Sequence, residues 1–266
     1  MKIPFSKYHG TGNDFILIDN RKQKIRVYDK KTIEELCHRR LGIGADGLIL
    51  LVKKKGFDFG MIYFNSDGNE GSLCGNGGRC ITVFARKLGI IKSEARFVAV
   101  DGEHKSEIIS DRKRINESIV RLKMNDAKVV KFGDSNYFIN SGSPHYVRIV
   151  ENLNMIDVLA DGRKIRTSKP YGKAGTNVDF VMKVKSGIRM RVYERGVEDE
   201  TFSSGTGAVA SSLAASHAGL ISDRNFCSVQ TKGGLLKVYF KRNENAFNNI
   251  WLEGPAVHSF EGILDY

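Results

Sequence analysis

The chain has 266 residues, which suits one large domain or two modest ones, and its 41% hydrophobic content excludes a disordered chain or a disulfide-held miniprotein. Its 42 Lys and Arg exceed its 30 Asp and Glu, which gives a formal net charge of +12. No nucleic-acid-reading motif accompanies this charge, so we expect a solvated basic surface and no nucleic-acid partner.

The apolar pattern predicts neither a membrane-spanning helix nor a secretory signal. No apolar run approaches the roughly 18 residues that a span requires, and the N-terminal residues lack the apolar core of a signal peptide. We therefore expect a cytoplasmic protein with no membrane partner. Its four cysteines, Cys37, Cys74, Cys80 and Cys227, form no C-x-x-C pair, so we predict free thiols and no bound metal.

Short segments rich in β-branched and aromatic residues predict strands along much of the chain. They lie at residues 15–19, 48–51, 59–65, 97–100, 118–123, 178–184 and 188–193. The apolar spacing predicts an amphipathic helix over residues 31–41. Two further predicted helices, residues 77–88 and 207–218, consist largely of apolar and small residues, which is typical of helices buried on most sides.

The two buried helices are preceded by similar segments. Each follows a strand and an acidic turn, then a cysteine or serine (Cys74 or Ser204) and a Gly-x-Gly turn, and the two positions are separated by about half of the chain. This repeat predicts an α/β (α+β) fold of two pseudo-symmetric domains, each a mostly antiparallel curled sheet around a central buried helix. We place the domains at residues 1–125 and 126–257, with residues 258–266 returning to the first domain.

The start of each buried helix predicts a chemical role. A thiol there meets unpaired backbone N–H groups and the positive end of the helix dipole, which lower its pKa below the free value of about 8.5. The same N–H groups bind anions, and glycines allow close approach. Two such segments facing each other would hold one α-amino-acid head between two ionisable groups. That arrangement suits proton removal on one face of the α-carbon and proton return on the other, with donors at the carboxylate stabilising the carbanion.

Several motifs resemble those of the diaminopimelate epimerase family. They occur in the family's order at residues 11–15, 44–47, 65–80, 175–178, 194–196, 200–201, 205–207 and 254–258. The resemblance implies a bacterial, cofactor-independent isomerase that interconverts LL- and meso-diaminopimelate for lysine and peptidoglycan synthesis. It also implies a small-molecule amino-acid substrate, a homodimer, and two cysteines that act as base and acid.

The resemblance assigns roles to particular positions. The catalytic positions are Cys74 and Ser204. The implied substrate-binding residues are Asn13, Asn65, Gly75, Asn76, Ser143, Asn177, Glu194, Arg195, Gly205 and Thr206, of which Ser143 stands where many members have asparagine. Arg195 would pair with the distal carboxylate, and Glu194 and the asparagines would hold the ammonium groups. His145 either contacts the site or stabilises a turn.

Ser204 departs from the family pattern, because the family's second cysteine falls at this position. A hydroxyl is a much weaker acid than a thiol, and no adjacent His or Lys suggests activation. Three interpretations remain open: an introduced Cys→Ser change, a natural member with altered chemistry, or a slow serine-dependent epimerase. We favour a chain that binds diaminopimelate but epimerises poorly. The alternatives are a non-epimerising binding relative and a one-cysteine, dehydratase-type enzyme for another amino acid.

Overall fold

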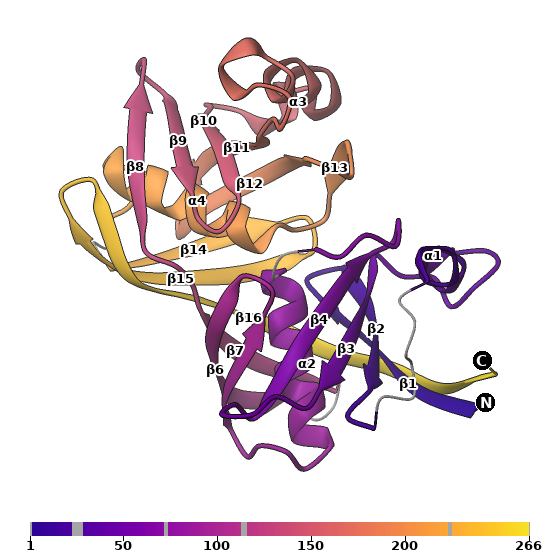
Figure 1. Cartoon of the computed structure of the whole chain (residues 1–266). Helices are drawn as coiled ribbons and strands as arrows, with labels where there is room; N and C mark the ends of the chain where they lie inside the picture. Colours follow the sequence, from indigo (N-terminus) through magenta and orange to yellow (C-terminus); the bar gives the residue numbers. More distant parts are fainter. Residues whose placement is uncertain (1, 23–28, 72–73, 113–115, 223–224, 266) are drawn as a thin grey trace. The chain divides into compact units, whose positions relative to one another are not determined.

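The computed structural model describes residues 2–22, 29–71, 74–112, 116–222 and 225–265 (Figure 1). The chain divides into two compact units, which we call unit 1 (Met1–Leu122 with Gly254–Tyr266) and unit 2 (Lys123–Glu253). Within the described ranges, no helix is both long enough and apolar enough to cross a membrane.

The strands of unit 1 form a closed, barrel-like ring. In chain order they are β1 (Lys2–Gly10), β2 (Asn13–Asp19), β3 (Gly47–Val52), β4 (Phe59–Asn65), β5 (Glu94–Ala99), β6 (Gly102–Arg112) and β7 (Glu117–Lys123). Each pairs with the next, and the C-terminal part of β16 (Ala246–Asp265) pairs with both β7 and β1 and closes the ring. The pairings β2–β3 and β4–β5 are parallel, and the others are antiparallel.

Helix α2 (Gly75–Lys87) fills the ring of unit 1. It contacts β1, β2, β3, β4 and β6, and every residue from Gly75 to Ala85 is buried. The packing at Gly77 admits no side chain, since a Cβ there would lie 2.9 Å from Cδ1 of Ile49. The sequence around this turn is therefore set by close contact between the helix start and β3.

Helix α1 (Lys30–Cys37) packs on the opposite face of the same strands. Ile33 and Cys37 lie in a cluster with Ile16, Leu48 and Leu50. Strands β2 and β3 are thus covered on both faces, which explains why their sequences are continuous apolar runs rather than alternating ones.

The predicted helix at residues 31–41 is four residues shorter at its C-terminal end than expected. The backbone becomes extended at His38. Nδ1 of His38 accepts hydrogen bonds from the backbone N–H groups of Arg40 (3.2 Å) and Leu41 (3.0 Å). The imidazole thereby replaces the carbonyl partners that would have continued the helix. Leu41, which extended the apolar pattern, is exposed.

Unit 2 has the same kind of closed ring. Its strands are β8 (Ala127–Phe132), β9 (Asn136–Asn140), β10 (Pro144–Ile149), β11 (Asn177–Val184), β12 (Gly187–Glu194), β14 (Phe226–Thr231), β15 (Gly234–Asn243) and the N-terminal part of β16. They pair in that order, and β16 pairs with β8 to close the ring. The pairings β10–β11 and β12–β14 are parallel. Strand β13 (Asp199–Thr201) pairs with β12 outside this ring.

The helices of unit 2 also follow the pattern of unit 1. Helix α4 (Gly205–His217) contacts the strands from β8 to β15 that form the ring and is buried along almost its whole length. Helix α3 (Val158–Arg166) packs on the opposite face of β11 and β12, near the short 3₁₀ helices η2 (Leu153–Met155) and η3 (Lys169–Tyr171). Because α4 consists mainly of Gly, Ala and Ser, the strands of the ring can approach it closely.

Strand β16 takes part in both rings. In unit 2 its N-terminal part pairs with β8, which also pairs with β9. In unit 1 its C-terminal part pairs with β7 and β1. Each ring also contains two parallel pairings, each bridged by a helix. The predicted α+β fold, with a mostly antiparallel curled sheet around a buried helix in each of two domains, is confirmed.

Candidate active site

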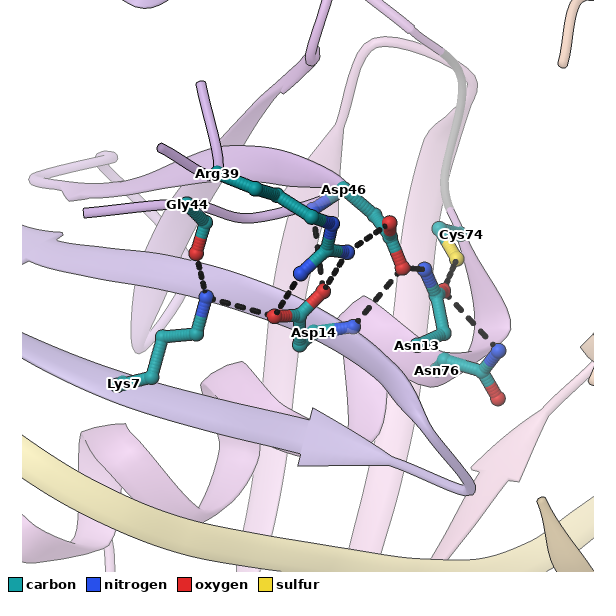
Figure 2. Close-up of polar contacts among 8 residues, drawn as sticks. All are labelled: Lys7, Asn13, Asp14, Arg39, Gly44, Asp46, Cys74 and Asn76. Atoms are coloured by element: carbon teal, nitrogen blue, oxygen red, sulfur yellow. Dashed lines mark hydrogen bonds and ion pairs between the residues drawn. The ribbon is translucent and has the colours of Figure 1, made fainter. Parts of the chain in front are cut away.

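In unit 1 the predicted catalytic cysteine lies at the start of the buried helix. Cys74 is the N-cap of α2, is half-buried, and makes no side-chain hydrogen bond to the helix N–H groups. Its Sγ donates instead to Oδ1 of Asn13 at 3.3 Å (Figure 2). The thiol therefore stands at the positive end of the helix with its proton directed toward a side-chain oxygen.

A chain of oriented amides surrounds this thiol (Figure 2). Nη2 of the Arg79 guanidinium donates to Oδ1 of Asn76 (2.7 Å), Nδ2 of Asn76 donates to Oδ1 of Asn13 (3.1 Å), and Nδ2 of Asn13 donates to Oδ2 of Asp46 (2.7 Å). A guanidinium can only donate and a carboxylate can only accept, so the two ends fix which way both amides point. The oxygen of Asn13 must therefore face Cys74.

Ionic side chains hold Asp46 and its neighbour in place. Arg39 donates to Asp46 (2.6 Å) and to both oxygens of Asp14 (2.8 and 3.1 Å), and Lys7 pairs with Asp14 at 2.7 Å and donates to the carbonyl of Gly44. Burial raises the pKa of Asp14, but hydrogen bonds from Arg39 and Lys7 outweigh this effect and hold the pKa at about 2. Asp14 is thus kept charged, and together with Arg39 it holds Asp46, the carboxylate end of the amide chain, in place.

Removal of the Asp14 charge is expected to destabilise unit 1. The pKa of its carboxyl falls from the ordinary 3.8 to about 2, so its contribution, about 2 kcal/mol, is complete above about pH 4 and is lost as the pH falls toward 2. Urea unfolding of the wild type and Asp14→Asn should therefore differ most near neutral pH and converge in acid. Asp134→Asn, a change in an exposed turn, is the control, and a difference that stays constant with pH would contradict the assignment.

Asn65 lies apart from this hydrogen-bonded chain. It ends β4, is exposed, and its Oδ1 accepts from the hydroxyl of Tyr63 at 2.9 Å. The backbone of Gly75 and Asn76 forms the first turn of α2. In unit 1 the structure therefore joins Asn13, Cys74 and Asn76 directly, and it places Asn65 at the end of a strand, where its side chain bonds to Tyr63 instead.

In unit 2, Ser204 occupies the position that Cys74 has in unit 1. It is the N-cap of α4, and its Oγ accepts a hydrogen bond from the N–H of Gly207 at 3.2 Å, as serine caps commonly do. A Cβ on Gly207 would lie 2.7 Å from Oδ1 of Asp179 and 3.0 Å from Cβ of Ser204. Glycine is required here because the carboxylate on β11 passes directly beneath the helix start.

A buried imidazole supports the first turn of α4. His145 and Asp179 are both fully buried, with Nδ1 of His145 2.7 Å from Oδ2 of Asp179 and Nε2 2.9 Å from Oγ1 of Thr206. The Oγ of Ser141 also donates to the carbonyl of Thr206 at 2.8 Å. Of the two roles considered for His145, this geometry gives contact with the helix start.

The other predicted residues of unit 2 form a second set of contacts. Nδ2 of Asn177 donates to Oγ of Ser143 (2.9 Å), and its Oδ1 accepts from the backbone N–H of Arg195 (2.9 Å). Oγ1 of Thr201 donates to Glu194 at 2.6 Å. Arg195 is half-buried, and within the described ranges its guanidinium bonds to the carbonyl of Ala174 (3.4 Å) but forms no ion pair with a carboxylate.

The remaining cysteines lie in different surroundings. Burial raises the pKa of Cys37 to about 12 and of Cys227 to about 11, and it raises that of Cys80 even further above the usual thiol value. They remain protonated at neutral pH and pack as small apolar residues. Among the described residues no group of three or more His, Cys, Asp and Glu could hold a metal ion.

Several residues of these clusters, among them Asp46, Asp179 and Arg79, were not identified from the sequence as site residues. Asp46 lies within a recognised motif, but nothing in the motif shows that it binds Asn13. Asp179 interrupts an apolar strand, and Arg79 is a charged residue in an otherwise apolar stretch of helix. A charge at a position patterned as buried is the sequence signal for both, because such a charge needs partners.

The sequence matches known proteins over nearly the whole chain. The family model for diaminopimelate epimerase matches residues 5–130 and 137–259. The diaminopimelate epimerase of Flavobacterium psychrophilum is 47% identical over 260 residues, which cover 97% of this chain and 98% of the relative. That of Chlorobaculum tepidum is 39% identical over 264 residues, or 96% and 98% of the two chains.

Solved structures share the fold at much lower identity. A phenazine biosynthesis protein of the PhzF family from Bacillus anthracis has a TM-score of 0.76 at 15% identity, with both chains covered completely. A hydroxyproline epimerase from Agrobacterium vitis has a TM-score of 0.70 at 13% identity and is covered to 92%, against 99% of this chain. At such identities the likeness concerns the fold alone. The sequence matches go further and confirm the resemblance noted from the motifs: the chain belongs to the diaminopimelate epimerase family.

Proposed function

We propose that this chain binds diaminopimelate and uses Cys74 to exchange the hydrogen on one face of its α-carbon. The Cα–H bond breaks, the proton passes to the thiolate sulfur, and the electron pair remains on the α-carbon, delocalised into the carboxylate. N–H donors at a helix start stabilise the charge that develops on that carboxylate. The observation that carries this proposal is the position of Cys74 as the N-cap of a buried helix, beside Asn13 and Asn76.

The proposed substrate contacts follow the hydrogen-bonding capacity of the side chains. Arg195, half-buried and without a carboxylate partner in the described part of the chain, suits the distal carboxylate, which it can bind in a bidentate manner. Glu194, Asn65 and Asn177 offer oxygens to ammonium groups, which only donate. The backbones of Gly75, Asn76, Gly205 and Thr206, with Ser143, complete the proposed binding set.

Ser204 is proposed to limit the reaction to one face. Its hydroxyl caps α4 by accepting from the N–H of Gly207, and among the described residues it donates to no base. A family member with two thiols could remove a proton on one side and return another on the opposite side, which inverts the α-carbon. In this chain the proton would return mainly from Cys74 to the same face, so we propose that inversion is slow.

Hydrogen exchange in D₂O tests the proposal. LL- and meso-diaminopimelate are incubated separately with the protein, and deuterium incorporation and inversion are followed by mass spectrometry and chiral chromatography. We expect one isomer to exchange with retention of configuration, the other to remain unlabelled, and inversion to be slow by comparison. Fast inversion would contradict the one-base mechanism. The absence of exchange in both isomers would favour a binding protein, and loss of water from a hydroxylated amino acid would favour a dehydratase.

A further inference from the structure

Arg79 is the most completely buried cation among the described residues. Its side chain is 0% exposed and lies within the ring of unit 1, on the second turn of α2. Its Nη1 donates to the carbonyl of Gly75 (3.2 Å), its Nη2 to Oδ1 of Asn76 (2.7 Å), and its Nε to the carbonyl of Pro255 on β16 (3.3 Å). All three acceptors are neutral.

No carboxylate neutralises this charge in the part of the chain that the structure describes. None of the ion pairs among the described residues of unit 1 includes Arg79, although a buried cation ordinarily requires a counter-ion. Burial lowers the pKa of Arg79 to about 10, and the groups that act against this lowering are two thiols, Cys80 and Cys74. The guanidinium is therefore still charged at neutral pH.

The two thiols are not equivalent as partners. Cys80 is fully buried, and its burial raises its pKa far above neutral pH, so it stays protonated. Cys74 is half-buried at the helix start and can exchange its proton with solvent. Of the two, only Cys74 can balance the charge of Arg79 as an anion.

The local packing directs the guanidinium toward the helix start. Helical side chains lean toward the N-terminus, and the bonds of Arg79 to Gly75 and Asn76 hold its head beside the first turn. The facing strand makes room for it, because a Cβ on Gly10 would lie 3.0 Å from Nη2 of Arg79. The backbone of Gly10 has no positive φ, so close contact with both Arg79 and Asn76 accounts for this glycine, since the same Cβ would lie 3.2 Å from Cβ of Asn76.

The equivalent place on α4 in unit 2 holds no charged side chain. Five residues after Ser204, α4 has the apolar Val209, and the carboxylate of Asp179 lies beneath its first turn. The two helix starts, alike in backbone, thus differ in the side chain buried behind them. An arginine follows Cys74 by five residues, and a valine follows Ser204 at the same spacing.

We propose that Arg79 is a positioning residue whose buried, uncompensated charge stabilises the thiolate of Cys74 in the ligand-free protein. The hydrogen bond from Cys74 to Asn13 favours the thiol, and the guanidinium favours the thiolate. Since Asn13 remains oriented by Asp46, loss of Arg79 leaves the contact that favours the thiol and removes the one that favours the thiolate. That this thiolate serves as the base rests on the proposed function; the charge effect itself does not.

The test is the pH profile of Cys74 alkylation by iodoacetamide, read by peptide mass spectrometry. Alkylation follows the thiolate fraction, so its midpoint reports Cys74 without any substrate. We expect the wild-type midpoint to lie below about 8.5 and to change little between about 0.05 and 0.5 M NaCl, because buried charges are poorly screened. Arg79→Gln should raise the midpoint by about one pH unit and slow alkylation near neutral pH by up to about tenfold. Arg79→Lys, which keeps the charge, should stay close to the wild type.

Arg86→Gln is the matched control, since it removes a charge from the same helix where Arg86 pairs with Asp111 near the surface. It should leave the midpoint unchanged. Arg79→Met, which removes the charge and keeps a long unbranched side chain, should also raise the midpoint and replaces Arg79→Gln if that variant does not fold. A wild-type midpoint at or above 8.5, or equal effects of Arg79→Gln and Arg79→Lys, would overturn the inference. Since none of these measurements uses diaminopimelate, failure of the exchange experiment leaves them valid, and their failure leaves that experiment valid.

Discussion

Ser204→Cys is expected to raise the rate of diaminopimelate inversion by about 10³-fold, the scale of a positioned acid–base group. The new thiol would stand at the N-cap of α4, as Cys74 stands at that of α2. It could therefore supply the second proton that the serine hydroxyl holds too tightly. Inversion is measured by chiral chromatography from both isomers.

The neighbouring serine provides the control for this change. Ser203 is also buried, and Ser203→Cys should add a thiol without raising inversion. Ser204→Cys also replaces the acceptor for the N–H of Gly207 with a poorer one, so we expect a loss of about 1 kcal/mol in stability. If inversion stays slow in a folded Ser204→Cys protein, the chain is not an epimerase limited at this position.

Cys74→Ala is expected to reduce α-hydrogen exchange in D₂O by at least about 10³-fold for the isomer that exchanges in the wild type. Ser204 would then be the only N-cap residue of the two buried helices with a hydroxyl or thiol, and it is too weak an acid to form the required anion. Binding of diaminopimelate, followed by calorimetry, should persist, because the proposed contacts of Arg195 and Asn177 remain.

Cys37→Ala distinguishes loss of the base from loss of any thiol. Cys37 is the last residue of α1 and is buried in the cluster of Ile16 and Leu48, where burial keeps its thiol protonated. The Cys37→Ala protein should exchange the α-hydrogen of diaminopimelate at the wild-type rate once its folding is confirmed. Full exchange in Cys74→Ala would assign the base to another group.

The sequence predicts the central strands of each ring well, because residues such as Ile16, Leu48 and Phe180 form apolar runs that only doubly covered strands require. It predicts α2 and α4 from their lack of a polar face. It misses β1, β6, β8 to β10, β13 to β16 and α3, since segments such as residues 2–10 mix Lys and Ser with apolar residues. Burial of those residues depends on which strand lies opposite.

In the candidate site, too, local features could be predicted from the sequence and contacts between distant segments could not. Motif spacing brings Cys74 and Ser204 to helix starts because a Gly-x-Gly turn is local. No spacing shows that Asp179 passes under Gly207, or that Pro255 accepts from Arg79, because both contacts join distant segments. The charges that tune a site are thus the part of it least visible in sequence.

Strand β16 has a consequence for the order of folding. Unit 1 closes its ring only with residues 254–265, so its first 122 residues must wait during synthesis until all of unit 2 has left the ribosome. Until then β1 and β7 expose unpaired edges, a state prone to association with other chains. The N-terminal unit is thus the last to be completed, and its stability depends on a strand whose other half belongs to its neighbour.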